Sequence, residues 1–293
     1  MKASLGGAEN MPENNGFWRK VHYSSRMQAV LDDYSFHYRS HGQETGLPLI
    51  FLHGFPFSSE MWTPQLEALP PEYRAYAYDL RGLGANEPGD GQYTIEGHVD
   101  DLLALMDHWK IPKAVLIGLS MGGYIALRAL ERNGDRFLAA VLADTRSETD
   151  SDPTRLRRAA QVKQVKAIGS LAFADVLLPA GFSPKSLESK PQAVSLIRKL
   201  IARTSPLGIA GTLIALAARS DTTSALDRLK LPVLILVGEK DGVTPVSSAQ
   251  SMHRRIPGSR LEIIPEAAHL SNLENPELFN RHLLEFLRSV PRP

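Results

Sequence analysis

The chain contains no cysteine among its 293 residues. A disulfide framework, a thiolate zinc site and a cysteine nucleophile are therefore excluded, and the composition fits a reducing cytoplasm, where we expect the protein to be located. An excess of one charge is also lacking, because 33 Lys and Arg residues face 32 Asp and Glu residues and leave a net charge of +1. We therefore expect neither nucleic acid nor an anionic membrane surface as a partner.

A long hydrophobic run is missing as well. No stretch reaches the roughly 18 consecutive apolar residues that a membrane-spanning helix needs, so we expect no membrane span. The opening MKASLGGAENMPENNG carries Gly, Asn and Glu where a secretory signal has its apolar segment. Residues 1–16 are therefore predicted to form a flexible N-terminal tail.

Strand-like and helix-like runs alternate along most of the remaining chain, which is 43% hydrophobic and long enough to bury a substantial core. MQAVL and YSFHYRS are predicted as two strands around a turn at Asp32 and Asp33. Further on, the buried-strand patterns LPLIFL, YRAYAY, AVLIGL, FLAAVLA and LPVLILV are separated by helical patterns. This alternation predicts an α/β fold with a mostly parallel central sheet flanked by helices.

The strand signal stops between residues 145 and 227. Helical patterns fill this stretch and are separated by Pro184, Pro191 and Pro206. We therefore predict a core formed by residues 17–144 and 228–293, with residues 145–227 inserted into it as a helical cap, or lid.

One serine stands at an unusual boundary, where the strand pattern AVLIGL meets the helical pattern MGGYIAL. Gly118 and Gly122 flank Ser120 in the G-x-S-x-G spacing of a sharp strand-to-helix turn, which exposes the serine at the carboxyl edge of a sheet. Small neighbours are needed there, and Gly123 is expected to let the helix approach the preceding strand. The helix N-terminus directs N–H groups and its positive dipole end at the hydroxyl, so Ser120 is the candidate nucleophile.

A serine nucleophile needs a base and a group that orients the base. His269, in PEAAHLSNLENP, follows a strand pattern and precedes a helical one, which places it at the same sheet edge as the candidate base. Asp241 in VGEKDGVTP and Asp144 in VLADTR both follow predicted strands and compete to orient the imidazole. Asp241 is favoured because its loop lies one strand before that of His269, and Asp144 stays open as the alternative acid. Each aspartate could instead have a purely structural role, Asp241 in an Asx turn and Asp144 as a helix cap.

Backbone N–H groups are expected to stabilise the oxyanion that attack by serine would create. Met121 directly follows the candidate nucleophile. A second donor is expected from the loop HGFP, where Gly54, after His53, lets the chain turn and leaves the N–H of Phe55 facing the pocket. Pro56 has no N–H to offer.

Five motifs, in this order, resemble those of the α/β-hydrolase superfamily: HGFP at 53–56, DLRGLGANEP at 79–88, GLSMGG at 118–123, GEKDGVTP at 238–245 and AAHLSNLENP at 267–276. The resemblance extends from about residue 27 to 290. Within the superfamily, the chain is most similar to 3-oxoadipate enol-lactonases, cofactor-free haloperoxidase-like perhydrolases and small carboxylesterases. The resemblance implies a Ser120–Asp241–His269 triad, an oxyanion hole from Phe55 and Met121, and a helical cap.

The identity of the nucleophile excludes two enzyme classes that share this fold. Haloalkane dehalogenases and epoxide hydrolases of this fold carry aspartate where this chain has Ser120. The chain also reads RGLGAN at 81–86 where relatives often read R-G-x-G-x-S, which weakens inference about the substrate but leaves the triad intact.

Together these residues predict a serine hydrolase that cleaves a small-molecule carboxylic ester or lactone through an acyl-enzyme, without a metal or cofactor. Perhydrolysis of the haloperoxidase type, or hydrolysis of a carbon–carbon bond on the same triad, is the enzymatic alternative. A ligand-binding protein with little turnover is the non-enzymatic one. Apolar residues of the predicted cap favour a hydrophobic acyl or alcohol group: Leu171, Phe173, Leu177, Leu178, Phe182 and Leu213. The oligomeric state is not predicted.

Overall fold

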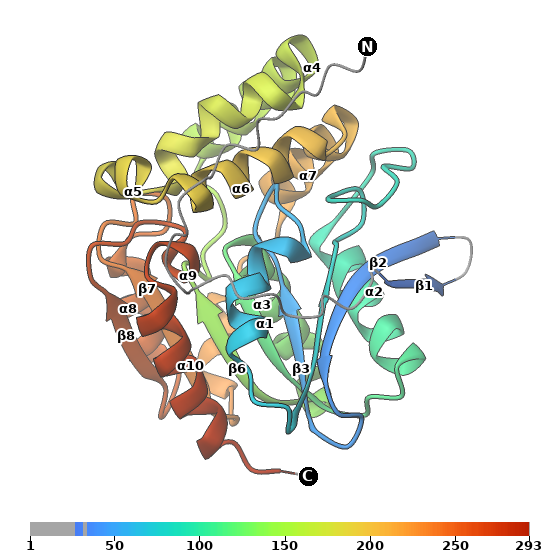
Figure 1. Ribbon diagram of the computed structural model, residues 1–293, viewed down its shortest axis with the longest axis vertical. Helices are drawn as coiled ribbons and strands as arrows, with labels where there is room; N and C mark the ends of the chain where they lie inside the picture. The colour runs from blue at the N-terminus through green and yellow to red at the C-terminus, as the bar shows by residue number, and fades with distance from the viewer. Residues whose placement is uncertain (1–26, 32–33, 293) are drawn as a thin grey trace, which may run out of the picture.

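The central sheet organises the molecule in the computed structural model, which describes residues 27–31 and 34–292 (Figure 1). The predicted tail of residues 1–16 and the turn at Asp32 and Asp33 lie outside these described residues. The strands are β1 (Met27–Leu31), β2 (Tyr34–Gly42), β3 (Leu47–Leu52), β4 (Tyr73–Tyr78), β5 (Ala114–Leu119), β6 (Phe137–Ala143), β7 (Val233–Gly238) and β8 (Arg260–Ile264). Their order in the sheet is β1-β2-β4-β3-β5-β6-β7-β8. Strand β2 runs antiparallel to β1 and β4, and the remaining neighbours are parallel, as the alternating pattern predicts.

Side chains of the sheet divide between two cores because successive residues of a strand point to opposite faces. In β3, Leu49 and Phe51 belong to one hydrophobic cluster, and Ile50 and Leu52 belong to the other. The first cluster is completed by α1 (Thr63–Ala68) and α10 (Pro276–Ser289). The second is completed by α2 (Ile95–His108), α3 (Met121–Asn133) and α8 (Val246–Arg255). Helices therefore cover both faces of the sheet, which is why its strands read as continuous apolar runs.

Residues 145–227 form helices and no strand. These are α4 (Asp152–Gly181), α5 (Pro184–Ser189), α6 (Pro191–Arg203), α7 (Pro206–Ala218) and a 3₁₀ turn at Thr223–Arg228. Figure 1 shows α4 to α7 gathered beyond one end of the sheet. Pro184, Pro191 and Pro206 each open a helix, where the missing N–H costs nothing. Helix α4 is interrupted at Gly169, whose φ of 77° is not helical.

Three further elements are short: the 3₁₀ turns at Ser59–Trp62 and Gly134–Arg136, and α9 (Ser271–Glu274), a single turn that follows the candidate base. Within the described residues, no single helix is both long and apolar enough to cross a membrane. Helices α6 and α7 pass such a test of length and composition only as a pair, and they are bent by 98° from each other.

Candidate active site

Ser120 lies at the tight turn that the glycine spacing predicts. Strand β5 ends at Leu119 and α3 begins at Met121, and the serine between them has φ 54° and ψ −113°. A non-glycine residue rarely adopts a positive φ, so the surrounding contacts must hold it there. Thr145 supplies one of them, because its Oγ1 donates to the Ser120 carbonyl at 2.8 Å. The Ser120 N–H donates to the carbonyl of Ala143 at 2.9 Å.

The glycines permit close approach of neighbouring backbones. A Cβ at Gly122 would lie 2.0 Å from the carbonyl oxygen of Leu52 in β3, and one at Gly118 would lie 2.3 Å from the Gly122 carbonyl. The role predicted for Gly123 differs in detail. A Cβ there would meet Thr145, after β6, at 2.4 Å, so Gly123 makes room for that loop rather than for the preceding strand.

Three side chains that are distant in sequence form one hydrogen-bonded chain. The distance from Ser120 Oγ to His269 Nε2 is 2.9 Å, and that from His269 Nδ1 to Asp241 Oδ2 is also 2.9 Å. Since a carboxylate only accepts hydrogen bonds, Nδ1 carries the proton and Nε2 is left to accept from the serine hydroxyl. The exposed fractions of Ser120, His269 and Asp241 are 8%, 7% and 4%, so these three side chains are almost fully shielded from solvent.

Burial and the attraction between His269 and Asp241 have opposite effects on the pKa values of these two side chains. Burial alone would lower the pKa of His269, but the Asp241 carboxylate outweighs it and the pKa is raised. Burial alone would raise the pKa of Asp241, but His269 and the hydrogen bonds from Thr244 bring it below its usual value. Asp241 is thus held ionised, and the imidazolium that forms when His269 takes a proton is stabilised.

Asp144 is hydrogen-bonded to residues other than Ser120, His269 and Asp241. It is fully buried, with Oδ1 accepting from the Gly238 N–H at 2.8 Å and Oδ2 lying 2.5 Å from Ser271 Oγ. Among the described residues it has no hydrogen bond to His269. Burial, followed by the nearby charge of Asp241, raises the pKa of Asp144 well above its usual value. The structure therefore brings both candidate acids to the site and joins only Asp241 to the imidazole.

The two backbone groups expected to bind an oxyanion follow neighbouring strands: Phe55 comes after β3, and Met121 comes directly after Ser120 at the end of β5. Across the part of the chain that the structure describes, the N–H groups of Phe55 and Met121 have no hydrogen-bond acceptor. The loop before Phe55 is fixed by His53, whose Nε2 accepts from the Leu80 N–H and whose Nδ1 donates to the Gly54 carbonyl, both at 2.9 Å. Burial lowers the pKa of His53, so this histidine is neutral and supports the loop.

Comparisons with known proteins identify the family. The family profile of the alpha/beta hydrolase fold matches residues 48–276. The chain belongs to the α/β-hydrolase family. It is 31% identical over 264 residues to 3-oxoadipate enol-lactonase 2 of Acinetobacter baylyi, an alignment that covers 90% of this chain and 96% of the relative. It is also 28% identical to a putative non-heme chloroperoxidase of Synechocystis, over 83% of this chain and 92% of that one.

Among solved structures, a thermophilic esterase from Thermogutta terrifontis matches this hydrolase with a TM-score of 0.85 and 33% identity, covering 90% of this chain and 98% of the other. The predicted fold, superfamily and branch are thereby confirmed, and the protein is supported as a hydrolase.

The apolar residues expected to line the pocket of this hydrolase do not all face inward. Phe173, Leu178, Phe182 and Leu213 are buried in the same cluster as Leu119, and Leu177 is partly buried against it. Leu171 is 53% exposed and lies outside this cluster. Helical spacing alone does not separate the two faces of α4, because apolar residues occur on both.

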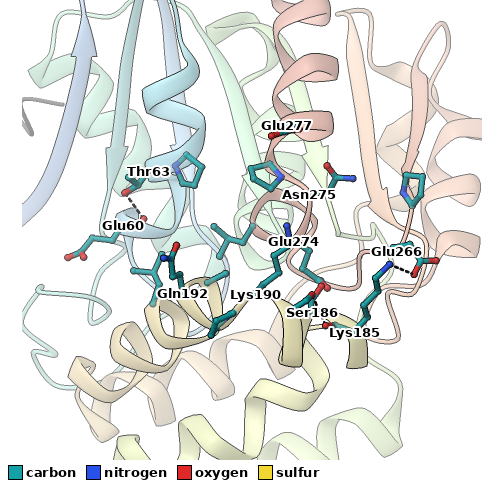
Figure 2. A pocket seen from close by; sticks show the side chains of 18 of the residues that line it. Glu60, Thr63, Lys185, Ser186, Lys190, Gln192, Glu266, Glu274, Asn275 and Glu277 are labelled. Carbon is teal, nitrogen blue, oxygen red and sulfur yellow. Dashed lines mark hydrogen bonds and ion pairs between the residues drawn. The ribbon is translucent and has the colours of Figure 1, made fainter. Parts of the chain in front are cut away.

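A groove of about 1120 Å³ opens elsewhere, between α5 and α6 on one side and α1, α9 and α10 on the other (Figure 2). Its lining includes Lys185, Lys190, Glu266 and Glu274, but none of the three hydrogen-bonded residues Ser120, His269 and Asp241. Across the described ranges, 27–31 and 34–292, no three His, Asp or Glu side chains are grouped so as to hold a metal ion.

Sequence analysis missed two buried charged groups. Asp150 is fully buried and paired with Arg146, Arg158 and Arg219. Glu274 is 4% exposed and accepts from two backbone N–H groups. The sequence could have indicated Glu274 by its position five residues after His269, in HLSNLENP. An acidic residue so close to the loop of the candidate base can form hydrogen bonds to that loop.

Proposed function

We propose that this hydrolase cleaves carboxylic esters, lactones included, through an acyl-enzyme formed on Ser120. The observation that carries the proposal is the unbroken hydrogen-bonded chain from Ser120 through His269 to Asp241, 2.9 Å at each step. The same constellation, a hydroxyl with a base and an oriented acid, performs acyl transfer on several unrelated folds.

Each group has one role in this reaction. Ser120 Oγ attacks the ester carbonyl while His269 Nε2 takes its proton, and Asp241 stabilises the resulting imidazolium. The N–H groups of Phe55 and Met121 bind the oxyanion, each such donor being worth roughly 3 to 4 kcal/mol in the transition state. The imidazolium then protonates the departing alcohol, and a water molecule activated by His269 releases the acid.

The charges inside the molecule favour a substrate that is neutral near the reacting carbonyl. Among the described residues, Arg219 is the one fully buried Lys or Arg, and it is paired with Asp150 and lies over the ring of Tyr124. We infer that the acyl group binds against the cluster that contains Leu119, Phe173 and Phe182, where a carboxylate without a cationic partner would be costly. We therefore propose an apolar ester, held under a cap of residues 145–227, as the preferred substrate, rather than an anionic lactone.

A chain-length series of p-nitrophenyl esters on the wild type and on Ser120→Ala, with fluorophosphonate labelling of both, tests the proposal. Turnover and labelling should both be lost in the variant, and neutral esters should be cleaved faster than an anionic lactone. A faster reaction with the anionic lactone would refute the apolar-substrate claim.

Two other results would redirect the assignment. Labelling without ester turnover would favour carbon–carbon bond hydrolysis or perhydrolysis, and bromide oxidation in the presence of acetate and peroxide would detect the latter. Neither labelling nor turnover would favour a binding protein.

A further inference from the structure

The loop that carries His269 is bonded to residues 181–183, where α4 ends and α5 begins. The Leu270 N–H donates to the carbonyl of Gly181 at 3.1 Å. Glu274 adds a second link, because its Oε2 accepts from the Ser183 N–H at 2.9 Å while its Oε1 accepts from the Ala268 N–H at 2.8 Å. One carboxylate thus bridges the cap and the residue directly before the candidate base.

This bridge is built from buried groups. Glu274 is 4% exposed and Ser183 is 1% exposed, so an N–H that lost its partner would pay the cost of an unsatisfied buried donor. Figure 2 shows Glu274 in the groove between the cap and the core, in the same region as Ser186 and Lys185. Lys185 makes only an exposed ion pair across this groove, with Glu266 at 3.6 Å. The buried bridge is therefore the stronger of the two links.

The bridge also brings a charge near the imidazole. Three acidic groups act on His269: Asp241 from the loop after β7, Asp144 from the end of β6, and Glu274 from α9. Ser120, directly before α3, and the cap residue Ser183 contribute neutral groups. The cation Lys240 is bonded to Glu266 at 2.9 Å, and its charge also interacts with that of Glu274. Each of the three acids raises the pKa of His269.

We propose that Glu274 is a positioning residue that couples the cap to the catalytic histidine: its carboxylate fixes the His269 loop only while Ser183 of the cap is docked against it. The proposal rests on the proposed function, in which His269 is the base. It assigns the cap a part in aligning the base, beyond covering the pocket. Breaking the bridge should misalign Nε2 from Ser120 and lower kcat by roughly ten- to a hundredfold, with KM changed less.

A matched pair of cap variants isolates the bridge. Ser183 has φ −65° and ψ 151°, and Phe182 before it has φ −117° and ψ 150°, so proline fits the backbone at 183. Ser183→Pro removes the N–H and directs the ring Cδ toward Glu274 Oε2, which lies 2.9 Å from the nitrogen, so the carboxylate is displaced. Ser183→Ala keeps the N–H and loses only the hydroxyl that caps α5. We expect the kcat loss in Ser183→Pro and near wild-type kcat in Ser183→Ala.

A second set of variants tests the charge without using turnover. Glu274→Gln removes the charge and one of the two acceptors, so the NMR titration midpoint of His269 should move to lower pH. Glu277→Gln removes the same charge from an exposed residue of the same groove and should leave the midpoint unchanged. Hydrogen exchange at residues 181–183 and 268–270 should quicken together in Glu274→Gln.

Equal kcat in Ser183→Pro and Ser183→Ala, or equal His269 midpoints in Glu274→Gln and Glu277→Gln, would overturn the coupling. Faster exchange in only one of the two segments would do the same. If Ser183→Pro does not fold, the Glu274→Gln titration and exchange decide. A wild type that hydrolyses no ester would instead refute the proposed function, and the titration would still report on the bridge.

Discussion

Replacing Asp241 by asparagine should disable the base by fixing the wrong tautomer of His269. Asp241 Oδ1 accepts from the N–H groups of Val243 and Thr244 at 2.8 and 2.9 Å. An asparagine must keep its oxygen there, because turning its NH₂ toward two donors would leave both unsatisfied. Its NH₂ then faces His269 Nδ1, which becomes an acceptor, and the imidazole proton moves to Nε2. Ser120 loses its proton acceptor.

The expected loss is about 10⁴-fold in kcat, the scale of the tautomer effect in serine triads. At 1.36 kcal/mol for each tenfold change, this corresponds to about 5.4 kcal/mol of transition-state stabilisation. Initial rates on the preferred p-nitrophenyl ester measure it, with circular dichroism to show that the fold is retained.

Asp144→Asn is the matched control, because it makes the same change in the other buried carboxyl. There the amide oxygen still accepts from Gly238 and the NH₂ can donate to Ser271 Oγ, so kcat should fall by less than about tenfold. A large loss in Asp144→Asn with near wild-type rates in Asp241→Asn would refute the assignment of the acid.

Three further predictions concern pH and stability. Since attraction to Asp241 outweighs burial and raises the pKa of His269, the inactive protonated base persists to higher pH, and kcat/KM should rise through a midpoint above the ordinary value of 6.5; a midpoint below it would contradict the ion pair. Gly122→Ala sets a Cβ 2.0 Å from a backbone oxygen and should lower the free energy of unfolding in urea by about 1 to 3 kcal/mol or more, whereas Gly134→Ala, with nothing within 4 Å, should not; equal midpoints would contradict the close approach. Asp150→Asn leaves three arginines without their buried partner and should cost about 3 to 5 kcal/mol in the same assay, while the exposed Asp175→Asn should leave the unfolding curve unchanged.

The features that sequence predicts well are those set by local patterns. The elbow at Ser120 is such a feature, because its strand, glycines and helix adjoin one another in the chain. The helices of residues 145–227 are another, since Pro184, Pro191 and Pro206 each mark where a helix begins. Parallel strands follow from the alternation of strand and helix, which leaves few ways to connect them.

Features that depend on contacts between distant segments are predicted poorly. The choice between Asp144 and Asp241 needs the side-chain direction at two neighbouring strand ends, which strand order does not supply. Spacing does not show that Phe173 is buried while Leu171 is 53% exposed, because the interrupted helix α4 carries apolar residues on both faces. The Glu274 bridge joins residues that are 91 positions apart, so no local pattern contains it.

The donors around each carboxyl explain why one acid can serve the base and its neighbour cannot. Asp241 accepts from two backbone N–H groups, the Thr244 hydroxyl and His269, whereas Asp144 has only the Gly238 N–H and the Ser271 hydroxyl. Donors stabilise the ionised form, so of two buried carboxyls in one site the better-supplied one keeps the negative charge. Most of the donors to Asp241 come from the turn that follows it. The Asx turn that sequence analysis set against a catalytic role therefore supports the role proposed for Asp241, because the turn holds the carboxylate ionised beside His269.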